Sequence, residues 1–91
     1  MKKINMLLDM CEAFDTNSYI VVAVKTPDTE KPELIINSPE NIKSKMKYYA
    51  QNYNEFLELN KNKDVKIINY ARGKSYMEAL VNITHKLEGV K

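Results

Sequence analysis

Apolar residues between positions 38 and 60 recur every three or four residues, a spacing that places them on one side of an α-helix. These apolar positions are Ile42, Met46, Tyr49, Tyr53 and Phe56. Ser38 suits the N-cap of such a helix, and Pro39 suits its first position, because a missing N–H costs nothing there. We therefore predict one long helix from Ser38 to Asn60, with its apolar side chains buried.

Two further helices are predicted, one at each end of the chain. Residues 2–14 place apolar side chains on one face, and Cys11 on that face is interpreted as a small buried hydrophobe. Residues 75–88 begin with Ser75 and Glu78 at the spacing of a capping box. His85 falls on the polar side of this helix with no second ligand at metal spacing, and we interpret it as an exposed surface residue.

Three runs of β-branched and apolar residues predict strands at residues 19–25, 33–37 and 65–71. The first run, YIVVAVK, is apolar almost throughout, so we expect both of its faces to be buried at the centre of a sheet. The predicted element order is α-β-β-α-β-α. A right-handed crossover then places the strands in a three-stranded antiparallel sheet of order 2-1-3, packed against helices. We expect a single α+β domain over residues 1–91, with the second sheet face covered by the terminal helices or by a second copy of the protein.

Overall composition changes this prediction little. The chain has 91 residues, a formal net charge of +2 and an ordinary apolar fraction of 44%. Its one cysteine excludes an internal disulfide and a cysteine-based zinc site. No apolar run approaches the ~20 residues of a membrane span, so we expect a cytoplasmic protein with no membrane partner.

Charge is distributed unevenly along the chain. Residues 41–75 carry eight basic and three acidic side chains, a local balance of +5, whereas residues 1–40 have a balance of −3. Around the ends of the third predicted strand, five basic residues are candidates for binding a nucleic acid or another anion: Lys61, Lys63, Lys66, Arg72 and Lys74. A solvated surface of a lysine-rich protein explains the same charges without a ligand.

The run from Arg72 to Ser75, RGKS, lies between a strand and a helix, as the end of a phosphate-binding loop does. The full loop needs a glycine five positions before Gly73, and the chain has Ile68 there, which excludes nucleotide hydrolysis by this loop. The helix start between two basic residues still suits a single phosphate or a partner's carboxylate. Neither a catalytic set nor a metal-ligand cluster is present, so we expect no catalytic residue, no metal, no cofactor and no enzymatic activity.

A second line of side chains follows the long predicted helix at i, i+4, i+7 and i+11, away from its buried side. The line consists of Tyr48, Asn52, Glu55 and Leu59. An exposed tyrosine and leucine with an amide and an acid between them suit contact with another protein. In the alternative interpretation, Tyr48 packs under the first helix and Leu59 closes the end of the long helix.

The middle of the chain resembles a group of small proteins from phages and prophages of AT-rich Gram-positive bacteria. The resemblance covers residues 19–71, and its most specific part is the run KMKYYAQNYNEFL from Lys45 to Leu57. The resemblance implies an accessory protein that acts by binding a host protein, as inhibitors of defence systems such as anti-CRISPRs do. It supplies no catalytic residues.

Three functional hypotheses follow from these observations. The first is a non-enzymatic phage-type protein that inhibits or redirects a host protein, such as a CRISPR or other defence nuclease complex. Its contact surface would be Tyr48, Asn52, Glu55 and Leu59, or the acidic first forty residues if it mimics nucleic acid. The second is a small DNA- or RNA-binding module that uses the basic residues of the third strand. The third is a homodimer that covers an open sheet face.

Overall fold

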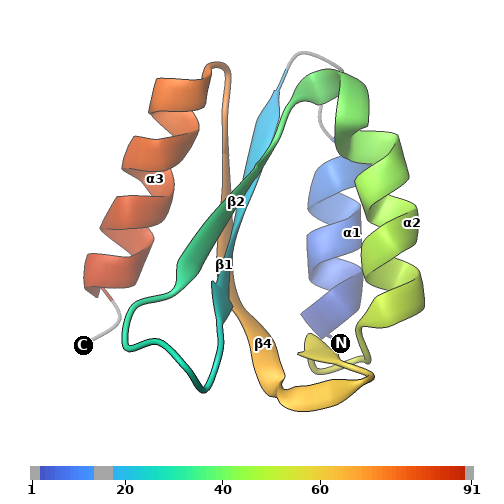
Figure 1. Cartoon of the computed structure of the whole chain (residues 1–91). Helices are drawn as coiled ribbons and strands as arrows, with labels where there is room; N and C mark the ends of the chain where they lie inside the picture. The colour runs from blue at the N-terminus through green and yellow to red at the C-terminus, as the bar shows by residue number, and fades with distance from the viewer. Residues whose placement is uncertain (1–2, 14–17, 90–91) are drawn as a thin grey trace.

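The elements of the fold follow the predicted order, with one short strand added before the last long strand (Figure 1). The computed structural model describes residues 3–13 and 18–89. The elements are α1 (Lys3–Ala13), β1 (Tyr19–Lys25), β2 (Glu33–Asn37), the 3-10 turn η1 (Pro39–Asn41), α2 (Ile42–Asn52), β3 (Glu58–Leu59), β4 (Asn62–Gly73) and α3 (Tyr76–Gly89).

The described strands form one antiparallel sheet of four strands in the order β2-β1-β4-β3. The predicted bounds of β1 and β2 are confirmed, and the order of the three predicted strands is confirmed with β4 as the third. The predicted number of strands is wrong. The two-residue strand β3 pairs with the start of β4. The third strand, predicted at residues 65–71, is also longer at both ends, because β4 pairs with β3 from Asn62 and with β1 as far as Gly73.

Both faces of the sheet are covered within one copy of the chain (Figure 1). The side chains of Ile20, Val22 and Val24 point to the layer of α1 and α2, where they join the larger core cluster. Val21 and Ala23 point to the other face and pack with α3. All five are nearly inaccessible to water, which confirms the prediction for β1. One terminal helix, α3, therefore supplies the second layer, whereas α1 shares the layer of α2, and no second copy is needed for that purpose.

The helix predicted from Ser38 to Asn60 is too long in both directions. Its first turn is the 3-10 turn η1, and the regular helix α2 ends at Asn52. Tyr53 is already extended, with φ −114° and ψ 145°. Tyr49 and Tyr53 are buried as expected, whereas Phe56 lies on the surface. The apolar spacing continues beyond the helix because residues in the following turn also reach the core, so spacing alone misplaced its end.

The hydrogen bonds at the helix starts agree only in part with the prediction. The capping box of α3 is confirmed in one half, since the Glu78 N–H donates to Ser75 Oγ at 3.1 Å. Ser38 makes no side-chain cap to the backbone; its Oγ accepts instead from Asn41 Nδ2. Cys11 lies within α1, and its side chain is outside the described part of the structure.

Candidate functional site

The four residues predicted to bind a partner do not form one line on a helix. Tyr48 and Asn52 lie on α2, where Asn52 Nδ2 donates to the Tyr48 carbonyl at 2.9 Å. Glu55 lies in the turn after the helix, and Leu59 lies in β3, half-buried against the core. The geometric premise of this prediction is wrong, because α2 ends at Asn52. Tyr48 remains 44% exposed.

The five basic candidates are divided between the two ends of β4. Lys61 lies in the turn before the strand and Lys63 near its start, whereas Arg72 and Lys74 lie at its far end. The strand runs nine residues from Lys63 to Arg72, which at about 3.3 Å per residue amounts to roughly 30 Å. Lys66 lies between the two groups, with Nζ 3.9 Å from Glu58 Oε2. The structure therefore spreads these residues along β4 and its two ends and does not gather them in one patch.

A tight turn after α2 decides which side chains reach the surface. Asn54 Oδ1 accepts the backbone N–H groups of Phe56 at 2.8 Å and Glu58 at 3.0 Å. Asn54 Nδ2 in turn donates to Glu58 Oε1 at 3.0 Å. Leu57 adopts the left-handed conformation, with φ 62°, which is rare for a residue other than glycine. This geometry turns Leu57 into the core, where it is 3% exposed, and leaves Phe56 outside at 59%.

The turn is joined to its neighbours through the backbone. The Ile67 N–H donates to the Leu57 carbonyl at 2.9 Å, which ties the turn to β4. The Ile4 N–H of α1 lies 3.3 Å from the Glu55 carbonyl. These bonds hold the turn beside the first helix and against the last long strand, so that residues distant in sequence share one surface.

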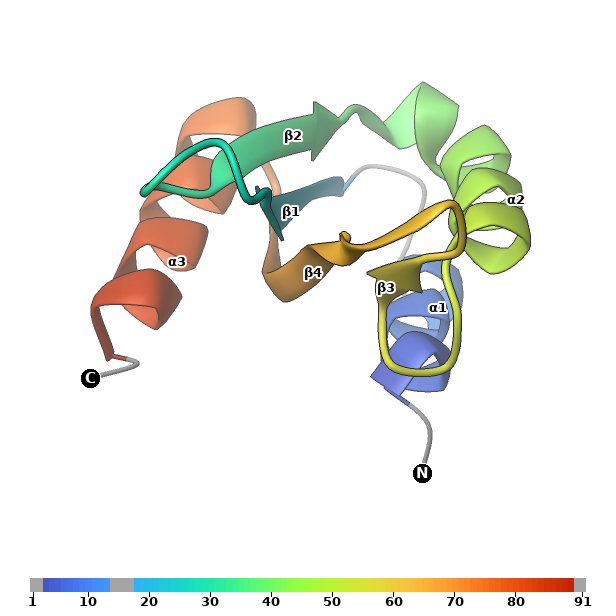
Figure 2. The ribbon, with the colours of Figure 1, turned by 60° about the horizontal axis from the view of Figure 1, so that its bottom comes forward.

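That surface is a groove of about 550 Å³ that lies between α1, the turn and the outer part of β4, and extends to α3. Figure 2 shows β4 between α3 on one side and α1 on the other. Three large apolar side chains of the groove are about half exposed, namely Phe56, Met6 at 50% and Ile68 at 48%. Its other lining residues are Leu57, Lys66, Ile67, Asn69, Tyr70 and Lys86.

An irregularity in the sheet accounts for the exposure of Ile68. Ala23 of β1 is opposite Asn69 and Val24 is opposite Ile67, so that Ile68 is an extra residue with no partner on β1. Such a β-bulge interrupts the alternation of side chains between the two faces of a sheet. Ile67 is consequently buried in the core, and the neighbouring Ile68 faces the groove.

Beyond the short strand β3, side chains occupy the outer edge of β4. The Tyr70 N–H donates to Asn69 Oδ1 at 2.9 Å, and the Tyr70 carbonyl accepts from Lys86 Nζ at 2.8 Å. The Arg72 carbonyl accepts from Asn82 Nδ2 at 2.7 Å. Backbone groups that would otherwise pair with another strand are thus satisfied by α3 and by β4 itself, which protects an edge from unwanted association.

A cluster of three tyrosines closes the other end of the α2 layer. The rings of Tyr49 and Tyr53 meet edge to face with centroids 5.9 Å apart, and Tyr48 packs on both. Lys45 Nζ lies 5.1 Å from the centre of the Tyr48 ring. Burial raises the pKa of the Tyr53 phenol, and the nearby Tyr48 hydroxyl adds to the rise. This cluster is structural, since two of its three rings are buried.

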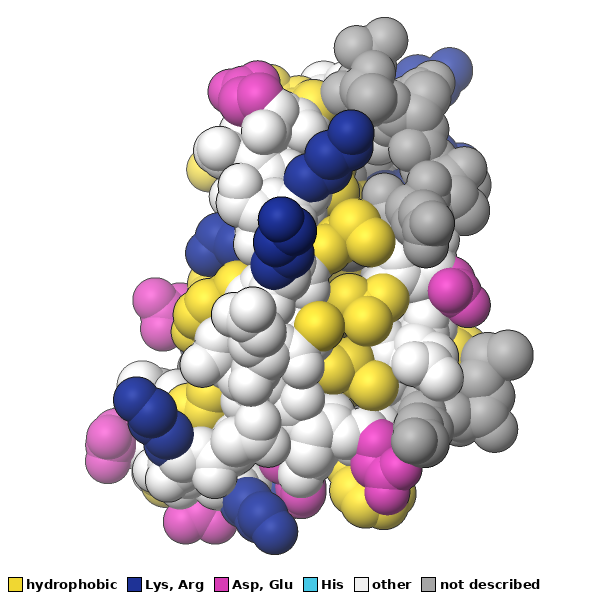
Figure 3. All heavy atoms as spheres, turned by 90° about the vertical axis from the view of Figure 1, so that its right-hand side faces the viewer, with side chains coloured by type: hydrophobic (Ala, Val, Ile, Leu, Met, Phe, Trp, Pro, Cys, Tyr) yellow, Lys and Arg dark blue, Asp and Glu magenta, His cyan; other side chains and the backbone are white. Residues whose placement is uncertain are grey.

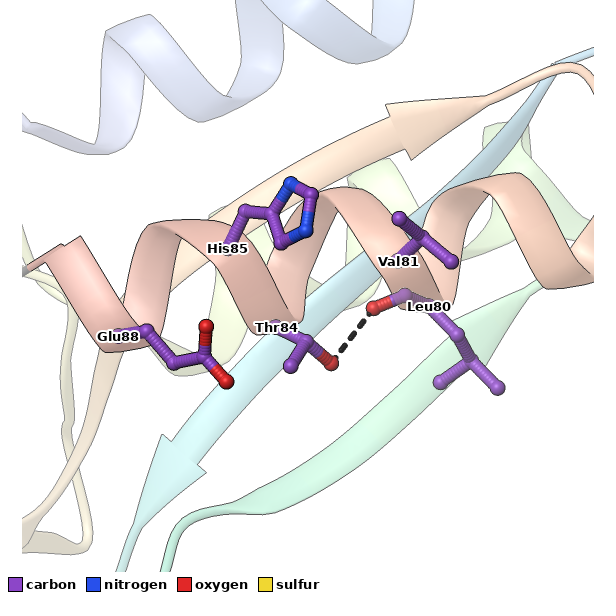
Figure 4. A pocket seen from close by; sticks show the side chains of 5 residues that line it. All are labelled: Leu80, Val81, Thr84, His85 and Glu88. Atoms are coloured by element: carbon purple, nitrogen blue, oxygen red, sulfur yellow. Dashed lines mark hydrogen bonds between the residues drawn. The ribbon is translucent and has the colours of Figure 1, made fainter.

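Two other surfaces are less suited to hold a ligand. The outer side of α3 has a hollow of about 230 Å³ lined by Leu80, Val81, Thr84, His85 and Glu88 (Figure 4). All five belong to one helix, and Thr84 Oγ1 donates back to the Leu80 carbonyl. His85 is exposed, as predicted.

Figure 3 shows hydrophobic side chains in the centre of the face that carries α1 and α2. Leu8 and Met46 of these two helices are half-buried and pack on the core, so this seam is part of the core.

Within residues 3–13 and 18–89, no group of three or more His, Cys, Asp or Glu side chains is placed to hold a metal ion. In the same part of the chain, no helix is long and apolar enough to cross a membrane.

Comparison of the chain with protein-family models, with curated proteins and with solved structures found no match. The candidate site is therefore defined by its own geometry.

Most residues of the groove were not predicted from the sequence, although the sequence contains signals for some of them. Met6 is an apolar residue off the buried stripe of the first helix, which is a sign of exposure. Asn52 and Asn54 are poor helix formers that favour turns, and they mark the region where α2 ends. The exposure of Ile68 has no signal in the sequence, because it depends on the bulge.

Proposed function

We propose that this chain is a non-enzymatic accessory protein of the phage type that the sequence resembles, and that it inhibits or redirects a host protein by binding it through the groove. The observation that carries the proposal is the presence of Phe56, Met6 and Ile68, all about half exposed, in one groove. Scattered single apolar residues on a surface need no explanation, but a contiguous group often marks a binding site.

The energetic argument favours an apolar contact in this groove. Full burial of a large apolar side chain is worth about 1.5–3 kcal/mol, so a partner that covers the exposed half of each residue gains roughly 1 kcal/mol per side chain. Aromatic and methionine side chains are also the types enriched at the centres of protein interfaces. Phe56 is the natural anchor because it is the most exposed of the three.

The nucleic-acid alternative is less well supported by the geometry. Four of its five basic residues lie in two groups at opposite ends of β4, and Tyr49 of α2 and Tyr53 just after it are buried and cannot stack on bases. We therefore retain protein binding as the proposed function and use the nucleic-acid alternative as an outcome of its test.

The test is affinity capture from a lysate of an AT-rich Gram-positive bacterium, with and without nuclease, followed by mass spectrometry. Three tagged forms are compared: the natural chain, Phe56→Ala, and the control Met77→Ala, which removes an equally exposed apolar side chain of α3 outside the groove. We expect one protein to be retained by the natural chain and by Met77→Ala, and about five- to tenfold less of it by Phe56→Ala.

Two results would contradict the proposal. One is equal retention by all three forms, which would place any contact outside the groove. The other is loss of all bound material on nuclease treatment, which would favour the nucleic-acid alternative. Circular dichroism of Phe56→Ala checks that the variant is folded, as expected for a side chain that lies mainly in water.

A further inference from the structure

We infer that the partner presents an acidic amphipathic helix to the groove, with apolar residues against Phe56, Met6 and Ile68 and carboxylates beside Lys66 and Lys86. The inference rests on the proposed function, because it specifies which segment of the partner protein occupies the same groove. Three features of the described residues support it, namely the sign of the charges, the state of the strand edge and the size of the groove.

The charged side chains among the described lining residues are two lysines, and no carboxylate lies among them. Lys86 Nζ uses one of its three N–H groups on the Tyr70 carbonyl, which leaves two donors for another acceptor. Lys66 has a side chain that is 51% exposed, and its distance of 3.9 Å from Glu58 is too long for a strong pair. Both ammonium groups therefore remain able to meet a partner's carboxylates, and a basic segment would be repelled.

The hydrogen bonds at the edge of β4 favour a helix over an extended strand as the segment of the partner that binds. A strand added to an edge needs free backbone N–H and C=O groups. Here the Tyr70 N–H, the Tyr70 carbonyl and the Arg72 carbonyl already bond to side chains. A strand added along these residues would compete with all three bonds and with the side chains that make them. A helix satisfies its own backbone and can use side chains alone, so the groove suits a helix.

The dimensions of the groove agree with this occupant. Its volume of about 550 Å³ is comparable with that of pockets that enclose small, largely apolar ligands. It has room for two or three apolar side chains, which a helix supplies at positions i, i+4 and i+7. The acidic residues of such a helix would then lie along its flanks, where the two lysines are.

The decisive experiment selects peptides rather than searching for one partner. A display library fixes a helical peptide with apolar residues at i, i+4 and i+7 and randomises the flanking positions. It is selected on the natural chain after depletion on Phe56→Ala. Because the chain contains no tryptophan, one tryptophan in each selected peptide reports its affinity by fluorescence. Every selected peptide is compared with a twin in which the acidic residues are replaced by lysine.

We expect enriched peptides to carry Asp and Glu at the flanks and their basic twins to bind at least tenfold more weakly. The variant Lys66→Gln/Lys86→Gln removes both positive charges and keeps a polar N–H donor on each side chain. It should weaken binding of the acidic peptides about five- to tenfold. The matched control Lys43→Gln/Lys47→Gln removes two exposed charges of α2 and should leave the affinity unchanged.

Several outcomes would overturn the inference. They are enrichment of neutral or basic flanks, the absence of any peptide enriched over Phe56→Ala, and equal affinities of the two double glutamine variants. If any of these occurs while lysate capture still depends on Phe56, the proposed function stands and only the acidic helix is wrong. If capture does not depend on Phe56, the proposed function itself fails.

Discussion

At the scale of single residues, Asn54 determines the course of the chain after α2. Its side chain holds the N–H groups of Phe56 and Glu58, and the left-handed Leu57 lies between them. This arrangement overturns the expected burial of Phe56, which lies in water, and places Leu57 in the core. A side chain that accepts nearby backbone N–H groups competes with the helix, which explains why α2 stops before it.

Tyr53 is expected to make the protein sensitive to alkali. Its raised pKa means that the native state holds the phenol proton more tightly than the unfolded chain, whose pKa is about 10. Its contribution is complete below the unfolded value and is lost as the pH rises through the folded pKa. Between about pH 9 and about pH 11, the unfolding free energy of Tyr53→Phe should therefore fall less than that of the natural chain.

Urea denaturation at both pH values measures this difference. The quantity compared is the change in unfolding free energy between the two pH values, and not the absolute stability, because the substitution also changes the packing. An identical change in unfolding free energy for the two proteins would show that Tyr53 contributes nothing to the pH dependence.

At the scale of elements, the approach of β4 to α3 is very close at Gly73. A Cβ atom at this position would lie 2.3 Å from the Ala79 backbone nitrogen and 2.7 Å from the Glu78 carbonyl carbon. These are backbone atoms of a helix and cannot move aside independently. Gly73 therefore sets how tightly the last helix packs on the sheet.

We expect Gly73→Ala to lower the unfolding free energy by about 3 kcal/mol or more, at the upper end of overpacking effects. The other glycine of the chain, Gly89, is the last residue of α3 and offers a matched control. Gly89→Ala should change stability little, because alanine is favoured over glycine in a helix. Urea denaturation compares the two, and a near-neutral Gly73→Ala would mean that α3 shifts to accommodate the methyl group.

A separate prediction concerns the edge of β4 that α3 protects. Asn82→Ala combined with Lys86→Ala removes the side chains that bond to the Arg72 and Tyr70 carbonyls. Free backbone acceptors at a sheet edge favour pairing with another chain. Light scattering should therefore show concentration-dependent association of the double variant, and Asn82→Ala alone should show less. A variant as monodisperse as the natural chain at every concentration would show that the edge needs no protection.

At the scale of the whole molecule, the two groups of basic residues lie far apart. Lys61 and Lys63 lie roughly 30 Å from Arg72 and Lys74 along β4. A nucleic-acid site requires many phosphate contacts on one continuous surface, and its affinity falls steeply with salt. The groove has an apolar centre instead, so its binding should be much less sensitive to salt.

We accordingly expect Arg72→Ala/Lys74→Ala and Lys61→Ala/Lys63→Ala each to retain the partner captured from lysate as the natural chain does. Raising the salt from about 50 mM to about 200 mM should weaken capture by far less than the 10³–10⁵-fold typical of extensive phosphate contacts. A loss of capture in either double variant, together with a steep salt dependence, would favour the nucleic-acid alternative.

The local pattern of the chain was sufficient to predict most of the fold. Continuous apolar and β-branched runs define β1 and β2 at their observed bounds, and the burial of β1 on both faces follows from its composition. The end of α2 and the strand β3 could not be predicted in the same way, because Tyr53 and Leu57 keep a helical spacing after the helix has ended. The bonds of Asn54, rather than the apolar pattern, decide the path there.

The groove depends on the tertiary structure for a physical reason. Met6, Phe56, Ile68 and Lys86 come from α1, a turn, β4 and α3, and each is unremarkable within its own segment. Periodicity reports only which side of an element is apolar, so it cannot show which exposed residues of distant elements meet. Their proximity results from the strand order β2-β1-β4-β3, the bulge at Ile68 and the backbone bonds of the turn, all of which form only when the whole chain is folded.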